Sequence, residues 1–158
     1  MTDTKPTTKR TSETRASASV WSKEERAAIQ EYARERKRSA RRDPAAERTA
    51  GEQDVLAKIA GLPDHDRSIA SRLHAVIMAA DPELWPRTWY GSPAYYRNGN
   101  LICFFQETAK FKTRYISLGF SDKAHLDDGT MWPVSYALME LTPADEERIA
   151  ALVKKAVS

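Results

Sequence analysis

The chain has 158 residues, of which 41% are hydrophobic and 30% charged, which is enough apolar material for one core beside a tail. Its net charge of +3 is uneven, because residues 1–50 hold 13 Lys and Arg against 8 Asp and Glu, whereas residues 51–158 hold 12 against 14. The single cysteine excludes an intramolecular disulfide and a multi-cysteine metal site, and no apolar run reaches the ~18 residues of a membrane span. Because Cys103 stands in the apolar run "LICFF", we expect a buried, inert thiol. With no apolar secretory signal near its start, the sequence predicts a cytoplasmic protein without membrane contact.

The first 48 residues divide into two segments. Residues 1–19 contain nine Ser and Thr and one large apolar residue, which predicts a disordered tail. In residues 20–48, Ser22 followed three positions later by Glu25 is a capping box, which predicts the start of a helix. The apolar stripe of this basic helical extension is thin, so we expect either a helix that is ordered only with a partner or one that docks loosely through three side chains: Trp21, Ile29 and Tyr32.

The run "RERKRSARR" at residues 34–42 concentrates positive charge. Such a run could hold phosphates without sequence preference. It has no interleaved aromatic residue, so a solvated helix face is the alternative interpretation. Weak nucleic-acid contact through residues 23–42 is therefore one hypothesis for a partner.

Residues 49–158 are predicted to form the folded domain. Its helices are expected in the stretches "GEQDVLAKIAGLP", "HDRSIASRLHAVIMAA" and "LTPADEERIAALVKKAV", where apolar residues recur at helical spacing. Gly61 ends the first helix, Asp64 caps the second and Thr142 caps the third.

Between the second and third of these helices, the pattern favours strands. Asn98-Gly99 is a strong hairpin signal, and a two-residue turn there pairs Tyr96 with Leu101 and Tyr95 with Ile102. Both faces of this hairpin are then apolar, which predicts a central strand covered on each side. Further strands are expected in "FKTRYISLGF" and "PVSYALME". The predicted fold class is α+β, with an antiparallel sheet of about five strands and helices packed on one face.

Three stretches carry a resemblance to a known family: "WYGSPAYYRNGNLICFFQ", "KFKTRYISLGF" and "HLDDGTMWPVSYAL". Over roughly residues 50–158 the chain resembles the YdhG-like family of domains of unknown function, with Y-G-x-P-x-Y as the most specific motif. The resemblance implies a small α+β domain with a frataxin-like or YjbR-like layout. It also implies a role as an iron chaperone that delivers ferrous iron (Fe2+), because one branch of the family is described so. Ser92 stands where the family usually has Met, which would make a pocket there more polar.

The bend at Tyr90–Pro93 is the first candidate site. Gly91 permits a positive φ, and bulges often direct side chains into sites. A plain β-bulge or a corner of the sheet is the structural alternative. Rings and polar tips from this region and from later strands could together wall a pocket, although most rings are expected in the core: Tyr90, Ser92, Tyr95, Phe104, Lys112, Tyr115 and Trp132.

His125, Asp127 and Asp128 are the candidate metal ligands. Imidazole and carboxylate groups suit iron(II), manganese or magnesium. The alternative is a surface turn closed by Gly129, because Asp-Gly turns are common. Lys110, Lys112 and Arg114 alternate along a predicted strand, where they would protect a sheet edge or line a cleft for an anion.

No catalytic motif names a reaction, so a binding or carrier protein is the predicted class rather than an enzyme. Its ligand would be iron or a small molecule held in an aromatic pocket. A nucleic-acid-associated protein that uses its basic N-terminal third is the second hypothesis. The third is an enzyme that uses Tyr95, Ser92 or His125 as acid or base, supported only by the general occurrence of perturbed groups in clefts.

Overall fold

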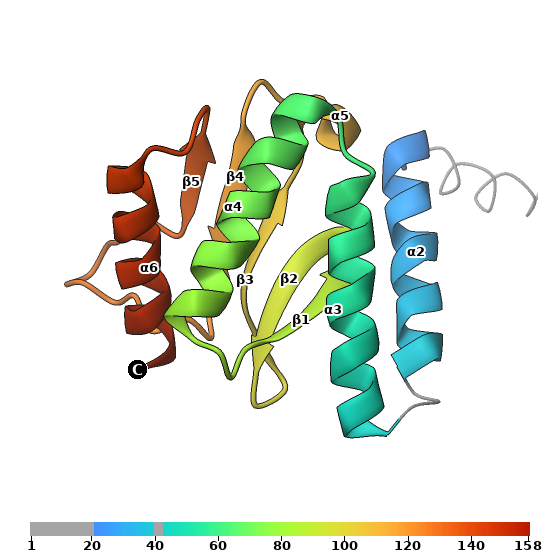
Figure 1. Ribbon diagram of the computed structural model, residues 1–158, viewed down its shortest axis with the longest axis horizontal. Coiled ribbons are helices and arrows are strands. Elements are labelled where there is room, and N and C mark those ends of the chain that lie inside the picture. The colour runs from blue at the N-terminus through green and yellow to red at the C-terminus, as the bar shows by residue number, and fades with distance from the viewer. Residues whose placement is uncertain (1–20, 40–42) are drawn as a thin grey trace, which may run out of the picture.

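Five antiparallel strands form one sheet in the order β1-β2-β3-β4-β5 (Figure 1). The computed structural model describes residues 21–39 and 43–158, so the predicted tail at residues 1–19 lies outside the described residues. The strands are β1 (Trp85–Trp89), β2 (Ser92–Arg97), β3 (Asn100–Gln106), β4 (Ile116–Phe120) and β5 (Ser135–Leu138). The α+β fold class and the central place of the strand after Asn98-Gly99 are confirmed.

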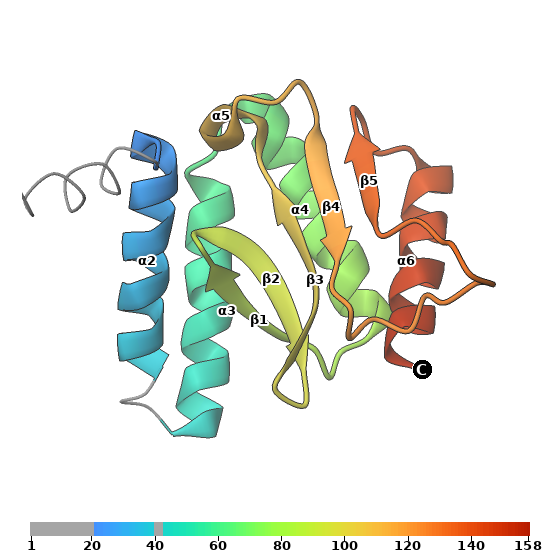
Figure 2. The ribbon, with the colours of Figure 1, turned by 180° about the vertical axis from the view of Figure 1, so that it is seen from behind.

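The long helices lie on one face of the sheet and beyond one of its edges (Figures 1 and 2). Helices α4 (Asp64–Ala80) and α6 (Pro143–Val157) cover one face, and α3 (Pro44–Ala60) lies along β1. Helix α2 (Lys23–Ser39) lies outside α3, and the short α5 (Thr108–Phe111) connects β3 to β4. Within these described ranges, no helix is both long and apolar enough to cross a membrane.

The core lies between the sheet and helices α4 and α6. Leu73 and Ile77 of α4 and Val153 of α6 are fully buried against the sheet residues Phe105 and Leu118. Each large apolar side chain contributes roughly 1.5–3 kcal/mol when it leaves water completely. This burial holds β3 and β4 in place and so fixes the register of the strands beside them.

Helix boundaries follow the predicted caps with two exceptions. The prediction that Asp64 caps α4 is wrong, because Pro63 holds the N-cap position without a side-chain hydrogen bond and Asp64 is already the first helical residue. The Ser22 hydroxyl accepts a hydrogen bond from the Glu25 backbone N–H at 3.1 Å, and Thr142 caps α6 in a reciprocal box with Asp145. Helix α3 begins earlier than predicted, because the Asp43 side chain accepts a hydrogen bond from the backbone of Ala46 and Pro44 starts the helix.

The register of the β2–β3 hairpin corrects one prediction. Asn98 and Gly99 have φ of 51° and 80° and form the expected two-residue turn. Tyr95, however, pairs with Cys103 instead of Ile102, because a bulge shifts the register between Tyr95 and Tyr96. Tyr95 therefore faces the helices together with Cys103.

The strand predicted at residues 111–120 is confirmed for residues 116–120, which form β4, but it is wrong for residues 111–115, where the chain forms the end of α5 and a turn. The Asp66 carboxylate, 2% exposed, accepts hydrogen bonds from the Thr108 backbone N–H and hydroxyl at the start of α5. Lys112 ends this helix with a left-handed φ of 52°. Lys110, Lys112 and Arg114 thus do not alternate along a strand.

The predicted cover on both faces of β3 is also wrong. In the described part of the chain, helices lie on one face only, and Figure 2 shows the other face open. On that open face the Phe104 ring lies over Gly119, where an added Cβ would be 2.6 Å from Phe104 Cζ. Trp89 packs on Phe104 with ring centroids 4.8 Å apart. Aromatic rings thus shield the backbone of the open face without a helix.

Candidate ligand pocket

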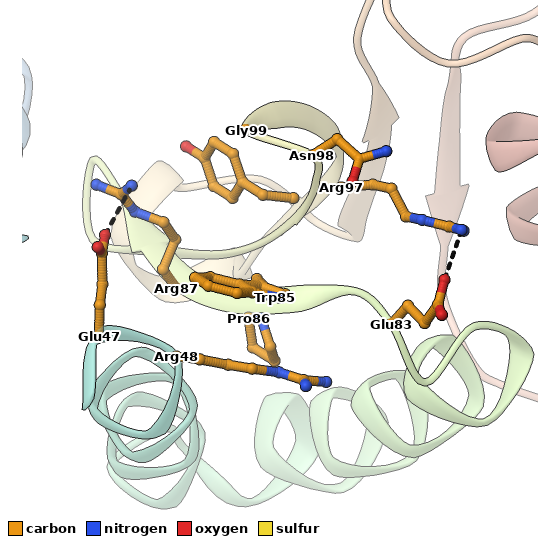
Figure 3. A pocket seen from close by; sticks show the side chains of 10 residues that line it. Glu47, Arg48, Glu83, Trp85, Pro86, Arg87, Arg97, Asn98 and Gly99 are labelled. Carbon is orange, nitrogen blue, oxygen red and sulfur yellow. Dashed lines mark hydrogen bonds and ion pairs between the residues drawn. The ribbon is translucent and has the colours of Figure 1, made fainter. Parts of the chain in front are cut away.

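A pocket of about 570 Å³ opens on the uncovered face, at the end of the sheet near the β2–β3 turn (Figure 3). Helix α3, the loop before β1, strands β1 and β2, and the turn itself contribute to it. We call it the Trp85 pocket, and ten residues line it: Glu47, Arg48, Glu83, Trp85, Pro86, Arg87, Tyr96, Arg97, Asn98 and Gly99.

Two aromatic rings form the apolar part of this pocket. The register of β1 and β2 pairs Trp85 with Tyr96, so both side chains lie on the open face of the sheet. Both rings are partly exposed. Burial raises the pKa of Tyr96 to about 12, although nearby Arg87 opposes the shift, and the phenol therefore keeps its proton at neutral pH.

Arg48 supplies a positive charge beneath Trp85. Its guanidinium carbon lies 6.0 Å from the centre of the Trp85 ring system. Its Nη2 donates to the Pro82 carbonyl at 2.6 Å and to the Leu84 carbonyl at 3.4 Å. Among the described residues no carboxylate pairs with Arg48, so its charge is not neutralised and its other N–H groups remain available to a ligand.

The other two arginines of the pocket are paired with carboxylates. Arg87 Nη1 lies 3.6 Å from Glu47 Oε1, and Arg97 Nη2 lies 2.6 Å from Glu83 Oε2. Figure 3 shows Trp85 between these two ion pairs. The pairs add acceptors and donors at both ends of the ring but little net charge.

This arrangement suits one kind of ligand. An exposed indole face stacks on a planar ring. An unneutralised guanidinium binds a carboxylate or phosphate through charge-assisted hydrogen bonds. A planar group that carries a negative charge would meet both requirements at once.

The structure separates the residues predicted around the Tyr90–Pro93 bend. Tyr90 and Gly91 have φ of 51° and 77° and form the two-residue turn between β1 and β2, which is neither the bulge nor the corner that the sequence suggested. Tyr95 is fully buried on the helix side, where its hydroxyl lies 2.7 Å from His74 Nδ1. Ser92 is 1% exposed, and its hydroxyl has no hydrogen-bond partner among the described residues.

The remaining pocket candidates lie apart from one another. Phe104 packs on Trp89 over the open face. Lys112 donates to Glu24 Oε1 of α2 at 3.0 Å, and Tyr115 lies in the loop before β4. Trp132 lines a different, shallow pocket of about 460 Å³ on the loop after β4. None of the seven predicted residues lines the Trp85 pocket.

The predicted metal ligands do not form a binding group. His125 Nδ1 lies 2.9 Å from the Ser158 carbonyl, and Asp127 lines the same shallow pocket as Trp132. Asp128 is exposed. Across residues 21–39 and 43–158, no three His, Cys, Asp or Glu side chains gather closely enough to hold a metal ion.

Sequence reasoning missed the Trp85 pocket, although one signal for it was present. In "WPRTW", Trp85, Arg87 and Trp89 alternate, which places their side chains on the same face of a strand. Arg48 could not be found in this way, because it reaches the pocket from a helix that begins 41 residues before β1.

Comparisons with known proteins add no relative to this description. No protein-family model, no curated protein and no solved structure matches the chain, so the resemblance to the YdhG-like family stays a prediction.

Proposed function

We propose that the chain is a small-molecule-binding domain, and that the Trp85 pocket holds a planar ring that bears a carboxylate or phosphate group. The observation that carries this proposal is Arg48, a guanidinium that lies against Trp85 and hydrogen-bonds only to carbonyls among the described residues. Its charge supplies the affinity for the anion, and Trp85 supplies the surface for the ring.

The size and mixed polarity of the pocket support the same proposal. About 570 Å³ lies within the usual range for small-molecule sites. Aromatic surface with a few polar groups is the usual lining of such sites, and here the polar groups are Glu47, Glu83 and the three arginines.

The test uses the full chain with indole-3-acetate as a charged probe and indole as its uncharged analogue. Binding is followed by NMR through the backbone amides and the Trp85 indole N–H. We expect indole-3-acetate to shift the signals of the pocket residues saturably. Arg48→Gln should weaken its binding at least tenfold, since a charge-assisted hydrogen bond contributes about 1.5–3 kcal/mol, and should leave indole binding unchanged.

Two further variants make the experiment specific. Trp85→Leu should weaken both probes, because each stacks on the indole ring. Arg114→Gln removes an exposed arginine that lies over Tyr115, remote from the pocket, and should change neither. The proposal would be contradicted if indole-3-acetate bound wild type and Arg48→Gln with equal affinity.

Iron handling and nucleic-acid contact, two of the other predicted functions, lack a comparable observation. Iron handling needs ligands that come together, and the described residues do not gather three. Nucleic-acid contact through residues 23–42 needs free cations, but Arg38 approaches Asp54 at 3.9 Å and residues 40–42 lie outside the described residues. A ferrous-iron titration and a salt-dependent DNA retention assay test them separately.

A further inference from the structure

Helix α2 meets the rest of the chain through its carboxylates. Glu24 Oε1 accepts a hydrogen bond from Lys112 Nζ at 3.0 Å. Glu31 Oε2 accepts one from Lys110 Nζ at 3.1 Å, and this ammonium also donates to the Tyr90 carbonyl at 2.9 Å. The acidic side of an otherwise basic helix is thus turned toward two lysines.

A third carboxylate of α2 binds the turn between β1 and β2. Glu35 Oε1 accepts a hydrogen bond from the Gly91 backbone N–H at 3.1 Å. Beside this contact, Tyr32 stacks on Tyr90 with ring centroids 4.3 Å apart and an interplanar angle of 13°. Tyr32 is the only one of the three predicted apolar anchors that docks.

The turn is shaped for a carboxylate at close range. A Cβ at Gly91 would lie 2.2 Å from Glu31 Oε2 and 2.4 Å from Lys110 Nζ, so a larger residue would push this ion pair away. The φ of 77° at Gly91 favours glycine independently. The positive φ of the turn thus favours glycine, and the flexible ends of the Glu31 and Lys110 side chains would have to move aside for a larger residue.

The attachment of α2 is nevertheless weak. Trp21 and Ile29 remain 53% and 43% exposed, so the helix buries little apolar surface. The Glu24–Lys112 pair is exposed to solvent, where ion pairs contribute little. Glu35 is buried with its Oε2 unpartnered among the described residues, and this burial raises the pKa of the carboxyl group. A helix held in this way can leave while the core beneath α4 and α6 stays intact.

We propose that Lys110, Lys112 and the Gly91 N–H form a binding surface for an acidic helical segment of a partner protein, and that α2 is its intramolecular occupant. We call it the Gly91 surface. Glu24, Glu31 and Glu35 stand at positions i, i+7 and i+11, which lie on one face of a helix. A partner segment needs carboxylates at this spacing and an aromatic ring at i+8, the position of Tyr32. This proposal does not depend on the Trp85 pocket.

The test places α2 in competition with itself. In the full chain, Glu24→Lys combined with Glu31→Lys reverses two of the three contacts and should release α2 from the Gly91 surface. A fluorescently labelled peptide of residues 21–39 with the natural sequence is then added, and binding is measured by fluorescence anisotropy. We expect the peptide to bind this variant at least tenfold more tightly than the wild-type chain, in which α2 occupies the surface.

Matched variants locate the binding. Adding Lys110→Gln and Lys112→Gln to the released variant should abolish peptide binding, because neutral side chains attract neither the carboxylates of the peptide nor the new lysines of α2. Adding Lys154→Gln and Lys155→Gln, two exposed lysines of α6 at the opposite end of the molecule (Figure 1), should leave it unchanged. A peptide with Gln at its Glu24 and Glu31 positions should not bind, because it lacks both partners of the two lysines.

Three results would overturn the proposal. The first is equal peptide binding to wild type and the released variant. The second is peptide binding that survives the neutralisation of Lys110 and Lys112. The third is loss of the near-ultraviolet circular dichroism of the core in the released variant, because the proposal requires the rest of the chain to stay folded without α2.

Discussion

Tyr95→Phe removes one hydroxyl from the centre of the core and tests whether the Tyr95 side chain has a structural role or a functional one. Tyr95 is 0% exposed, and its hydroxyl lies 2.7 Å from Nδ1 of His74, which is 9% exposed. The variant keeps the ring and its packing, but it loses a hydrogen bond and leaves a buried imidazole nitrogen without this partner. A net hydrogen bond contributes about 1 kcal/mol, and an unsatisfied buried polar atom costs about 1–3 kcal/mol. We therefore expect the free energy of unfolding to fall by about 2 kcal/mol.

The assay is urea unfolding at pH 7.5, with thermal unfolding as a check. For a chain of this length about 2 kcal/mol corresponds to a fall of roughly 4–8 °C in Tm. Tyr136→Phe is the control, because its partly buried ring touches Phe120 and its hydroxyl makes no hydrogen bond among the described residues. It should change stability by less than about 0.5 kcal/mol. An equal fall in the free energy of unfolding for Tyr95→Phe and Tyr136→Phe would refute the reasoning. If Tyr95→Phe instead lost ligand binding at unchanged stability, Tyr95 would have the role in a site that the sequence suggested.

The pH dependence of stability tests the same Tyr95–His74 pair. Burial lowers the pKa of His74 below its ordinary value of 6.5, so stability should be lost as the pH falls below about 6.5. This loss should be smaller in His74→Gln. Glu35→Gln should stabilise the chain at neutral pH, because burial raises the pKa of this carboxyl above 4.5. The contribution of Glu35 to stability is therefore greatest below that pH and is lost as the pH rises through the raised pKa, a dependence that the variant should reduce in urea titrations. Gly119→Ala should lower the free energy of unfolding by about 1–2 kcal/mol in the same assay, because the added Cβ would displace the Phe104 ring that lies over Gly119. Unchanged stability would contradict this contact. Cys103 is 0% exposed, and burial raises its pKa to about 12, so a thiol reagent should modify it only after unfolding, and rapid reaction in the native protein would be inconsistent with the packing.

Local signals in the sequence were sufficient for much of the fold. The capping residues Ser22 and Thr142 and the turn at Asn98-Gly99 act within a few residues of themselves, so their structure could be predicted without the rest of the chain. The predicted strand at residues 111–115 failed for the opposite reason. The start of α5 is stabilised by Asp66, which lies 42 residues earlier and is brought there by α4.

The candidate site could not be predicted, because no single segment contains it. Trp85 and Arg87 alternate in a recognisable way, but their pocket also needs Arg48 from α3 and Tyr96 from β2. The sequence directed attention to Tyr95, whose position depends on a bulge that period-two alternation does not reveal. A shift of one residue moved this ring from one face of the sheet to the other.

The close approach of α3 to β1 limits how copies of this chain can assemble. The backbone of Gly51 lies so near β1 that an added Cβ would be 2.4 Å from the Pro86 carbonyl oxygen, and Pro86 itself has no N–H to donate. A strand from another molecule can therefore not continue the sheet beyond β1. In the described part of the chain β5 pairs only with β4, so it is the one edge left for addition. Within the described residues, two copies that pair through β5 would therefore leave no sheet edge for a third copy.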